Sequence, residues 1–210
     1  MAINDSYKHE IYRKSIHLSS LWIVFLIWFF DKNISITILG TLTFLILATE
    51  ILRHKIDFIA IIYNKIFGSI LRDHEKEAHN KFSLSGGFYV LAAALISVII
   101  FPQIIAIAAI TIMLISDTAA ALIGRKFGKH KLMTKSVEGS LAFFLSAIIV
   151  IYVLYRLTGY DINFLISGII ASVFATLIEL FAKQIKIDDN ITITLTVGAI
   201  MTAYVHFLPI

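Results

Sequence analysis

Cysteine is absent from this 210-residue chain, proline occurs only 2 times, and charged residues make up 15% of the sequence. The lack of cysteine excludes disulfide bonds and thiolate metal sites. Soluble domains carry about 25% charged residues, and a chain that is 59% hydrophobic has more apolar surface than one soluble core can bury. We therefore predict an all-α, polytopic membrane protein. The absence of repeats and low-complexity tracts predicts a single transmembrane domain over residues 1–210.

Apolar runs of about 20 residues are long enough to cross a bilayer as helices, and the sequence contains seven such runs. The first follows basic residues, as in a signal peptide, but no small-residue cleavage motif comes after it, so we expect a retained span. In segment 55–72, isoleucines at helical spacing are interrupted by charged residues. This pattern favours an interfacial amphipathic helix over an eighth span. The predicted spans are 12–30, 34–52, 84–101, 103–123, 138–156, 162–182 and 189–208.

The distribution of lysine and arginine predicts the orientation of these spans. With the N-terminus inside, nearly all of the 18 basic residues lie on the inner side, and only Lys32 and Arg156 lie outside. The prediction is therefore N-in and C-out, with the bilayer rather than nucleic acid as partner. Acids also gather near the inner ends of different spans, which favours a shared polar cavity over separate pairs with nearby bases. These acids are Glu10, Glu50, Asp117, Glu138, Glu179, Asp188 and Asp189.

The stretch from Ser116 to Ser140 joins the fourth and fifth predicted spans and is the part of the chain richest in polar residues. Asp117, Gly124 and Gly128 recur at helical spacing, so a continuous helix presents them on one face. Glycines at such a spacing also serve helix packing in membranes, and that alternative stays open here. Several basic residues follow directly, and these are Arg125, Lys126, Lys129, Lys131 and Lys135.

The second half of this stretch opens the fifth predicted span. A helix N-terminus offers free N–H donors and a favourable dipole to phosphate, and Lys135, Ser136 and Gly139 lie there. Glu138 could merely favour the helix N-terminus, but with Asp117 it supplies two carboxylates beside one phosphate site. Mg²⁺ is commonly held by a few carboxylates and phosphate oxygens. The spacing of a P-loop is absent.

These residues resemble the signature of the CTP-dependent lipid kinases, which include dolichol (polyprenol) kinases, phytol kinases and the yeast-type diacylglycerol kinase. The resemblance extends along nearly the whole chain. Its central motif is Asp117-Thr-Ala-Ala-Ala-x-x-Gly124-Arg-x-x-Gly128-Lys, followed by Lys135-Ser-x-Glu138-Gly139-Ser. Further matches are Glu10-x-x-Arg13-Lys14-x-x-His17, Arg72-x-x-Glu75 before Ser85-Gly86-Gly87, and Asp188-Asp189-Asn190.

The phosphatidate cytidylyltransferases share part of this pattern and also use CTP and Mg²⁺. Two departures favour the kinases. The segment from Lys129 to Lys135 is short and lacks a proline-containing insert, and the end of the chain lacks a histidine–glycine–glycine and aspartate-rich signature. A CTP:lipid-phosphate cytidylyltransferase is therefore the alternative. A transporter is a weaker third possibility, because its charges would be expected near mid-span.

The kinase resemblance implies Mg-assisted transfer of the γ-phosphoryl group of CTP to the hydroxyl of a membrane lipid alcohol, at the cytoplasmic face. The acceptor would be a polyprenol, phytol or geranylgeraniol, or diacylglycerol. The implied metal ligands are Asp117, Glu138, Asp188 and Asp189. The implied nucleotide-binding residues are Arg13, Gly124, Arg125, Gly128, Lys129, Ser136, Gly139 and Asn190. The implied catalytic residues are Asp117, Lys135, Glu138, Asp189 and His17.

His17 lies one helical turn after Arg13, on the same face. Because imidazole titrates near neutral pH, His17 is a candidate general base. The alternative is a buried histidine bonded to a carboxylate such as Glu50. Asp117 or Asp189 could deprotonate the alcohol instead, and the chain could also form a homo-oligomer.

Overall fold

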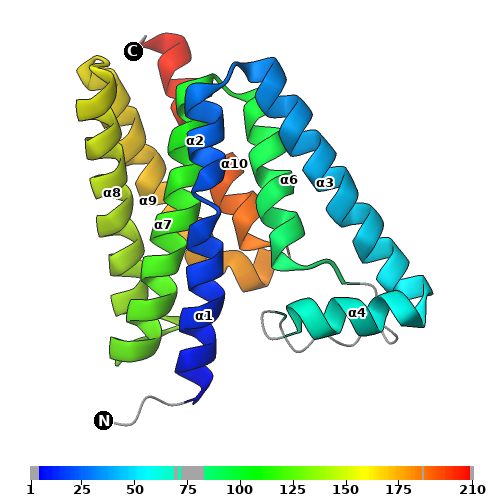
Figure 1. The fold of residues 1–210 in the computed structure, drawn as a ribbon. Coiled ribbons are helices and arrows are strands. Elements are labelled where there is room, and N and C mark those ends of the chain that lie inside the picture. Colours follow the sequence, from blue (N-terminus) through cyan, green and yellow to red (C-terminus); the bar gives the residue numbers. More distant parts are fainter. Residues whose placement is uncertain (1–4, 69–70, 72–82, 186, 209–210) are drawn as a thin grey trace.

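Helices account for almost all of the computed structural model, which describes residues 5–68, 71, 83–185 and 187–208 (Figure 1). The predicted all-helical architecture is confirmed, apart from one short antiparallel hairpin. Arg72 and Glu75 of the family motif lie outside the described residues. The helices are α1 (Asp5–Ser19), α2 (Trp22–Phe29), α3 (Lys32–Lys55), α4 (Asp57–Phe67), α6 (Gly86–Ile100), α7 (Gln103–Phe127), α8 (Val137–Thr158), α9 (Ile162–Ile185) and α10 (Asp189–Phe207), and the strands are β1 (Lys131–Leu132) and β2 (Lys135–Ser136).

Helix α7 is the centre of the bundle. It packs against α1, α2, α6, α8 and α10, and it lies between α8 on one side and α1 and α2 on the other (Figure 1). A helix that is apolar all round is typically buried, and every residue from Ile105 to Leu114 is buried. The burial continues through Ser116, Asp117 and Thr118, so α7 carries an acidic side chain into the interior.

Side-chain caps begin the helices that follow α7. Ser136 precedes α8, and its Oγ accepts a hydrogen bond from the backbone N–H of Gly139 at 3.1 Å. Asp188 precedes α10, and its Oδ1 accepts from the N–H of Asn190 at 3.0 Å. Such caps satisfy donors that have no partner within the helix. Helix α8 ends at Gly159, whose φ of 68° is one that glycine adopts readily.

Glycine permits the closest contact between α7 and α8. A Cβ atom added to Gly139 would lie 3.0 Å from the carbonyl oxygen of Ala120 and 3.2 Å from the Cα of Gly124. A Cβ atom added to Gly124 would lie 3.1 Å from Ser136 Oγ. These glycines therefore pack the two helices together, as the helix-packing alternative predicts.

Replacing Gly139 with alanine should lower the stability of the protein by about 1–3 kcal/mol, because added atoms in a tight contact force the backbone to shift. Both of the nearest atoms belong to the backbone of α7 and cannot rotate away. Thermal unfolding in detergent measures the effect. Gly86→Ala is the matched control, since a Cβ atom there would meet nothing within 4 Å. Equal melting temperatures for the two variants would contradict the prediction.

Five helices are long and apolar enough to cross a membrane, namely α3, α7, α8, α9 and α10, and they indicate an integral membrane protein. Helix α6 is apolar but shorter, with 15 residues. The predicted span 12–30 is divided between α1 and α2. At the break, Ser20 N–H bonds to the carbonyl of His17 at 3.1 Å and Leu21 N–H to that of Leu18 at 3.0 Å, which is 3₁₀-type bonding. The count of seven spans stays a prediction.

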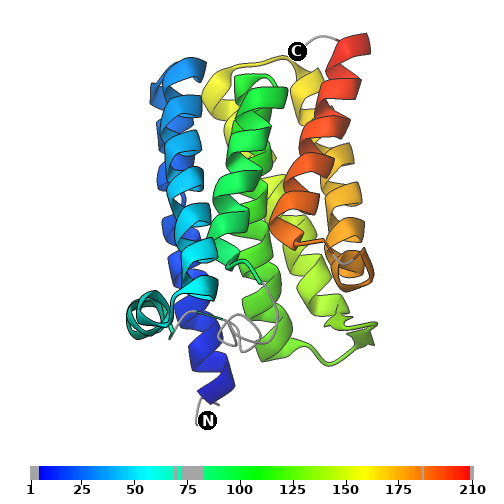
Figure 2. The ribbon, with the colours of Figure 1, turned by 90° about the vertical axis from the view of Figure 1, so that its right-hand side faces the viewer.

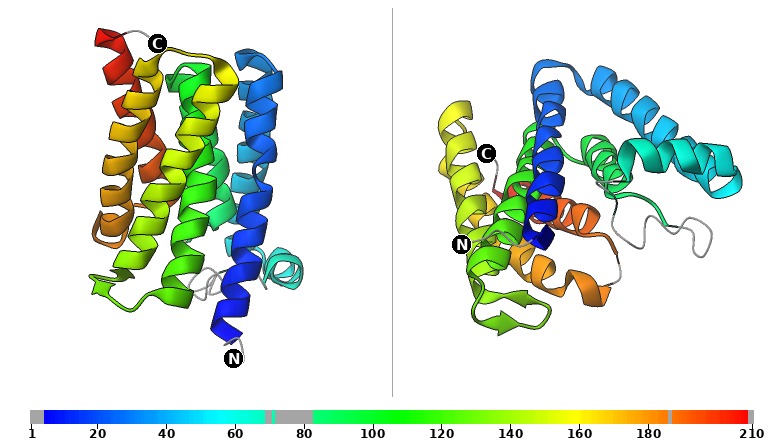
Figure 3. Two further views of the ribbon diagram at one scale, coloured as in Figure 1. Left: turned by 90° about the vertical axis from the view of Figure 1, so that its left-hand side faces the viewer. Right: turned by 60° about the horizontal axis from the view of Figure 1, so that its bottom comes forward.

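The polar ends of the helices gather toward one end of the bundle. The start of α1, the hairpin and the start of α8 lie at that end, and the last turns of α10 lie at the other (Figures 2 and 3). Helix α4 crosses beside the polar end (Figure 1). It exposes the apolar side chains of Phe58, Ile61 and Ile66 at 70%, 67% and 60%. Residues 69, 70 and 72 of that segment lie outside the described part, and the interfacial location stays a prediction.

Candidate functional site

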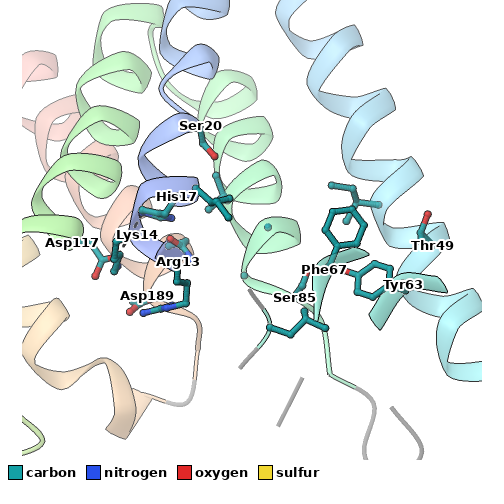
Figure 4. Close-up of a pocket in the computed structure, with 17 residues that line it drawn as sticks. Arg13, Lys14, His17, Ser20, Thr49, Tyr63, Phe67, Ser85, Asp117 and Asp189 are labelled. Carbon is teal, nitrogen blue, oxygen red and sulfur yellow. Dashed lines mark hydrogen bonds and ion pairs between the residues drawn. The ribbon is translucent and has the colours of Figure 1, made fainter. Parts of the chain in front are cut away.

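Asp117 lies at the centre of the polar end. Helix α1 packs against α7 and brings Lys14 and His17 to the Asp117 carboxylate. Lys14 donates a hydrogen bond to Asp117 Oδ2, and both side chains are buried. His17 Nε2 lies 3.6 Å from the same oxygen, and the three residues lie close together in Figure 4. The alternative predicted a carboxylate such as Glu50 beside a buried His17. The carboxylate beside His17 is Asp117, and Glu50 has other partners.

Glu10 joins the start of α1 to the end of α7. Its Oε1 accepts from Arg13 Nη2 at 2.6 Å, and its Oε2 lies 3.1 Å from Arg125 Nη2. Burial alone would raise the pKa of Glu10, but the hydrogen bond and charge of Arg13, with the charges of Arg125 and Lys14, lower it below its ordinary value. Glu10 therefore stays ionised and holds two guanidinium groups in place.

These side chains line a cavity of about 790 Å³, within the range of about 300–1,000 Å³ that is typical of small-molecule sites. One wall consists of small residues at the junction of α7 and α8. In the described part of the chain the charged lining is balanced, with five carboxylates and five cations. The carboxylates are Glu10, Asp117, Glu179, Asp188 and Asp189, and the cations are Arg13, Lys14, Arg125, Lys131 and Lys135.

Helix α9 contributes Glu179 to this cavity, opposite the start of α8. Lys135, which precedes the cap residue Ser136, donates a hydrogen bond to Glu179 Oε1. The second oxygen, Oε2, is buried and has no hydrogen-bond partner among the described residues. Ser140 Oγ, in the first turn of α8, is likewise buried and without a partner there. The hydrogen bond from Lys135 to Glu179 therefore joins the segment before α8 to α9. Two polar atoms without a partner in the described part of the chain, Glu179 Oε2 and Ser140 Oγ, belong to these same two helices.

A second cavity, of about 340 Å³, shares lining residues with the first, and Figure 4 shows its lining side chains. Its lining comes from α1, α3, α4, α6, α7 and α10 and from Ser20, Leu71 and Ser85. Four charged residues, Arg13, Lys14, Asp117 and Asp189, line both cavities. The charged residues of the smaller cavity therefore lie where it meets the larger one. Most of its remaining wall surface is apolar and comes from residues such as Ile16, Ile46 and Val90, and uncharged polar side chains such as Tyr63 and Ser85 also line it.

A buried ion pair supports the far side of the smaller cavity. Glu50 and Arg53 are 0% and 1% exposed, and Arg53 Nε donates to Glu50 Oε2 at 2.6 Å. Tyr63 of α4 and the N–H of Ser85 both donate to Glu50 Oε1, at 2.8 and 3.2 Å. Burial raises the pKa of Tyr63 to about 12, so its hydroxyl remains a donor. Glu50 is thus bonded to Arg53 of α3, Tyr63 of α4 and Ser85. It does not join the Asp117 cluster, contrary to the prediction.

Comparison with known proteins shows to which family the chain belongs. Residues 4–187 match the profile of the cytidylyltransferase family. The chain belongs to that family. It is similar to uncharacterised proteins of Rickettsia prowazekii (31% identical over 97% of this chain and 98% of the relative) and of Methanocaldococcus jannaschii (30% over 94% and 95%). CTP-dependent diacylglycerol kinase 1 of Schizosaccharomyces pombe is 28% identical over 90% of each chain. The resemblance to CTP-dependent lipid kinases is confirmed, and no solved structure matches.

Most predicted site residues of this cytidylyltransferase-family chain lie around the two cavities. Asn190 and His17 line the smaller cavity, and Asn190 Nδ2 donates to Asp188 Oδ1 at 2.6 Å. The roles predicted for all of these residues stay predictions. The larger cavity is lined by Asp117, Lys135, Asp188, Asp189, Arg13, Gly124, Arg125, Gly128, Ser136 and Gly139.

Two predicted residues of the family signature lie apart from these cavities. Glu138 Oε1 is 2.8 Å from His130 Nδ1 and accepts from the His130 N–H at 3.2 Å. It does not line the cavity that Asp117 lines, so the structure does not bring the two predicted metal-binding carboxylates together. Lys129 is exposed in the connection before β1 and lines neither cavity.

Sequence reasoning missed Lys14 as a site residue. The positions of Glu10, Lys14 and His17 in the sequence put all three on one helical face. A lysine between an acid and a histidine on one helical face, next to an apolar run, is a signal that could have identified it.

Proposed function

We propose that this protein is a CTP-dependent kinase that transfers the γ-phosphoryl group of CTP to the hydroxyl of a membrane lipid alcohol. The observation that carries the proposal is the pair of adjoining cavities, one large and charged and one smaller and mostly apolar. CTP would occupy the first and the lipid alcohol the second. The names of the fission-yeast and Saccharomyces cerevisiae relatives, both CTP-dependent diacylglycerol kinases, support this reaction type.

The reaction would take place where the cavities meet. The alcohol oxygen attacks the γ-phosphorus, the bond from that phosphorus to the β–γ bridging oxygen breaks, and CDP leaves. The proton of the alcohol passes to Asp189 or His17, which both line the smaller cavity. Lys14 and Arg13 would offset the charge of the transferred group, so catalysis would rest on positioning and electrostatic stabilisation.

A magnesium ion fits this arrangement if it arrives with the nucleotide. Among the described residues, no group of three His, Cys, Asp or Glu side chains is arranged to hold a metal alone. Mg²⁺ needs only one or two carboxylates when phosphate oxygens supply further ligands. Asp117 and Asp189 would hold the ion, with Asp188 nearby, and its charge would offset that of the phosphates.

We further propose that the chain is one catalytic domain with seven spans, N-in and C-out, so that the polar end faces the cytoplasm. The short apolar helix α6 and the pair α1–α2 would be the two spans beyond the five long helices. The exposed apolar side chains of α4 would rest in the bilayer interface. The acceptor would be a polyprenol, phytol, geranylgeraniol or diacylglycerol, and the protein could assemble as a homo-oligomer.

Radiolabelled CTP tests the reaction. With the protein in membranes, CTP labelled at the γ-phosphate should label the lipid, and CTP labelled at the α-phosphate should not. Label from the α-phosphate in the lipid would instead establish the cytidylyltransferase alternative, which the name of the family favours. Farnesol, phytol, a polyprenol and diacylglycerol, supplied in turn, identify the acceptor. Membranes that lack the protein provide the control.

A further inference from the structure

Glu179 lines the larger cavity and has one carboxylate oxygen without a hydrogen-bond partner among the described residues. The side chain is buried, and one carboxylate oxygen accepts from Lys135. The other oxygen, Oε2, has no hydrogen-bond partner within the described ranges, and the residue lines the larger cavity. A buried acceptor that lacks a donor is costly. A ligand in the larger cavity that carries a hydrogen-bond donor would satisfy this oxygen.

The two carboxylate oxygens of Glu179 differ in their hydrogen-bond partners. Lys135 directly precedes the capped N-terminus of α8, which is the part of the cavity that suits phosphate. Phosphate oxygens are acceptors and cannot satisfy a carboxylate oxygen. If the nucleotide supplies the donor, it comes from the cytosine amino group or a ribose hydroxyl. Ser140 Oγ, also unsatisfied in the described structure, lines the same cavity.

We propose that Glu179 is a specificity-determining residue that accepts a hydrogen bond from the nucleoside half of the nucleotide. This inference rests on the proposed function, because it requires CTP in the larger cavity. If the donor is the cytosine amino group, the residue also rejects uracil. Uracil has a carbonyl oxygen where cytosine has its amino group, so two acceptors would then face each other. Carboxylates pair with the cytosine amino group in the same manner in nucleic-acid recognition, and opposed acceptors give discrimination.

Nucleotide binding by the purified protein in detergent tests the proposal. The ligands are CTP, UTP, 2′-deoxy-CTP and 3′-deoxy-CTP, and the variants are Glu179→Gln and Lys135→Met. Glutamine keeps the shape and can still accept from Lys135, but it can place an N–H₂ group where the carboxylate oxygen was. We expect Glu179→Gln to reduce the preference for CTP over UTP by about 10- to 100-fold. Lys135→Met should weaken the binding of CTP and UTP alike, because the proposed arrangement places Lys135 beside the phosphates.

The other outcomes are equally informative. An unchanged CTP-to-UTP ratio with a lost preference for CTP over one of the deoxy nucleotides supports the proposal and identifies a ribose hydroxyl as the donor. Equal weakening of all four nucleotides would overturn it and make Glu179 only a positioning residue for Lys135. Unchanged binding of all four also overturns it. Weaker Mn²⁺ binding in the presence of CTP, with intact nucleotide preferences, overturns it in favour of a metal ligand. Wild-type protein that binds no CTP contradicts the proposed function itself.

Discussion

Phosphorylation of the lipid should fall by about a hundredfold to a thousandfold when Asp117 is replaced by asparagine, which is the range for loss of one preorganised electrostatic group in an active site. Asp117 is buried, pairs with Lys14 and faces His17. It also lines both cavities. Asparagine keeps the shape but removes the charge that would hold magnesium and orient Lys14. Transfer of γ-label from CTP to lipid measures the effect, and unchanged transfer would falsify the assignment of the site.

The control for this variant must separate chemistry from folding. Asp117→Asn leaves the ammonium group of Lys14 buried without an acid, and breaking a buried pair in this way costs about 3–5 kcal/mol. The double variant D117N/K14M removes both charges, so it should recover most of the melting temperature but none of the activity. If the double variant regains activity together with stability, Asp117 is a structural residue and the proposed mechanism is wrong.

Helical periodicity predicted which residues share a face, and those predictions required only the spacing along one helix. Asp117 and Gly124 lie on α7 as the pattern indicates, and Ser136 caps α8. The contact of Gly124 with Gly139 agrees with the packing alternative. Predictions of this kind succeed because backbone geometry alone fixes the direction of each side chain.

The direction of Glu138 could not be predicted in this way, because it depends on the hairpin before α8. Hairpin turns are recognised in a sequence mainly through Asn-Gly or Asp-Gly pairs, and this turn contains Met133 at a φ of 56° instead. Without the hairpin in view, nothing in the sequence indicated that His130 lies beside Glu138. The predicted pairing of Glu138 with Asp117 followed from proximity in the sequence rather than in space.

Glu50 illustrates a second limit. Its location near the inner end of a predicted span gives its depth along the bundle axis but not its rotation about the helix axis. The side chain turns to Arg53 on its own helix and to α4, away from Asp117. A strong local ion-pair partner three residues on was the available sign of this outcome.

Replacing Glu50 with alanine should destabilise the protein strongly, by about as much as Asp117→Asn. Arg53 is 1% exposed and would be left buried without its acid, which costs about 3–5 kcal/mol. For a chain of this size that corresponds to a fall in melting temperature of about 6–20 °C. Lys65→Ala on α4 is the control, because that side chain is exposed and its loss should change stability by less than about 0.5 kcal/mol.

The Glu50→Ala change should also weaken the binding of the lipid alcohol without weakening that of CTP. Tyr63 and Ser85 bond to Glu50 and also line the smaller cavity, whereas Glu50 lines neither cavity. Below its melting temperature, the Glu50→Ala variant should therefore show a raised KM for the lipid alcohol and an unchanged KM for CTP. The double variant E50L/R53M, which removes the arginine charge as well, should recover stability but not the lipid KM, since Tyr63 still lacks its acceptor. A CTP KM that rises equally with the lipid KM would show that the two cavities do not divide the substrates as proposed.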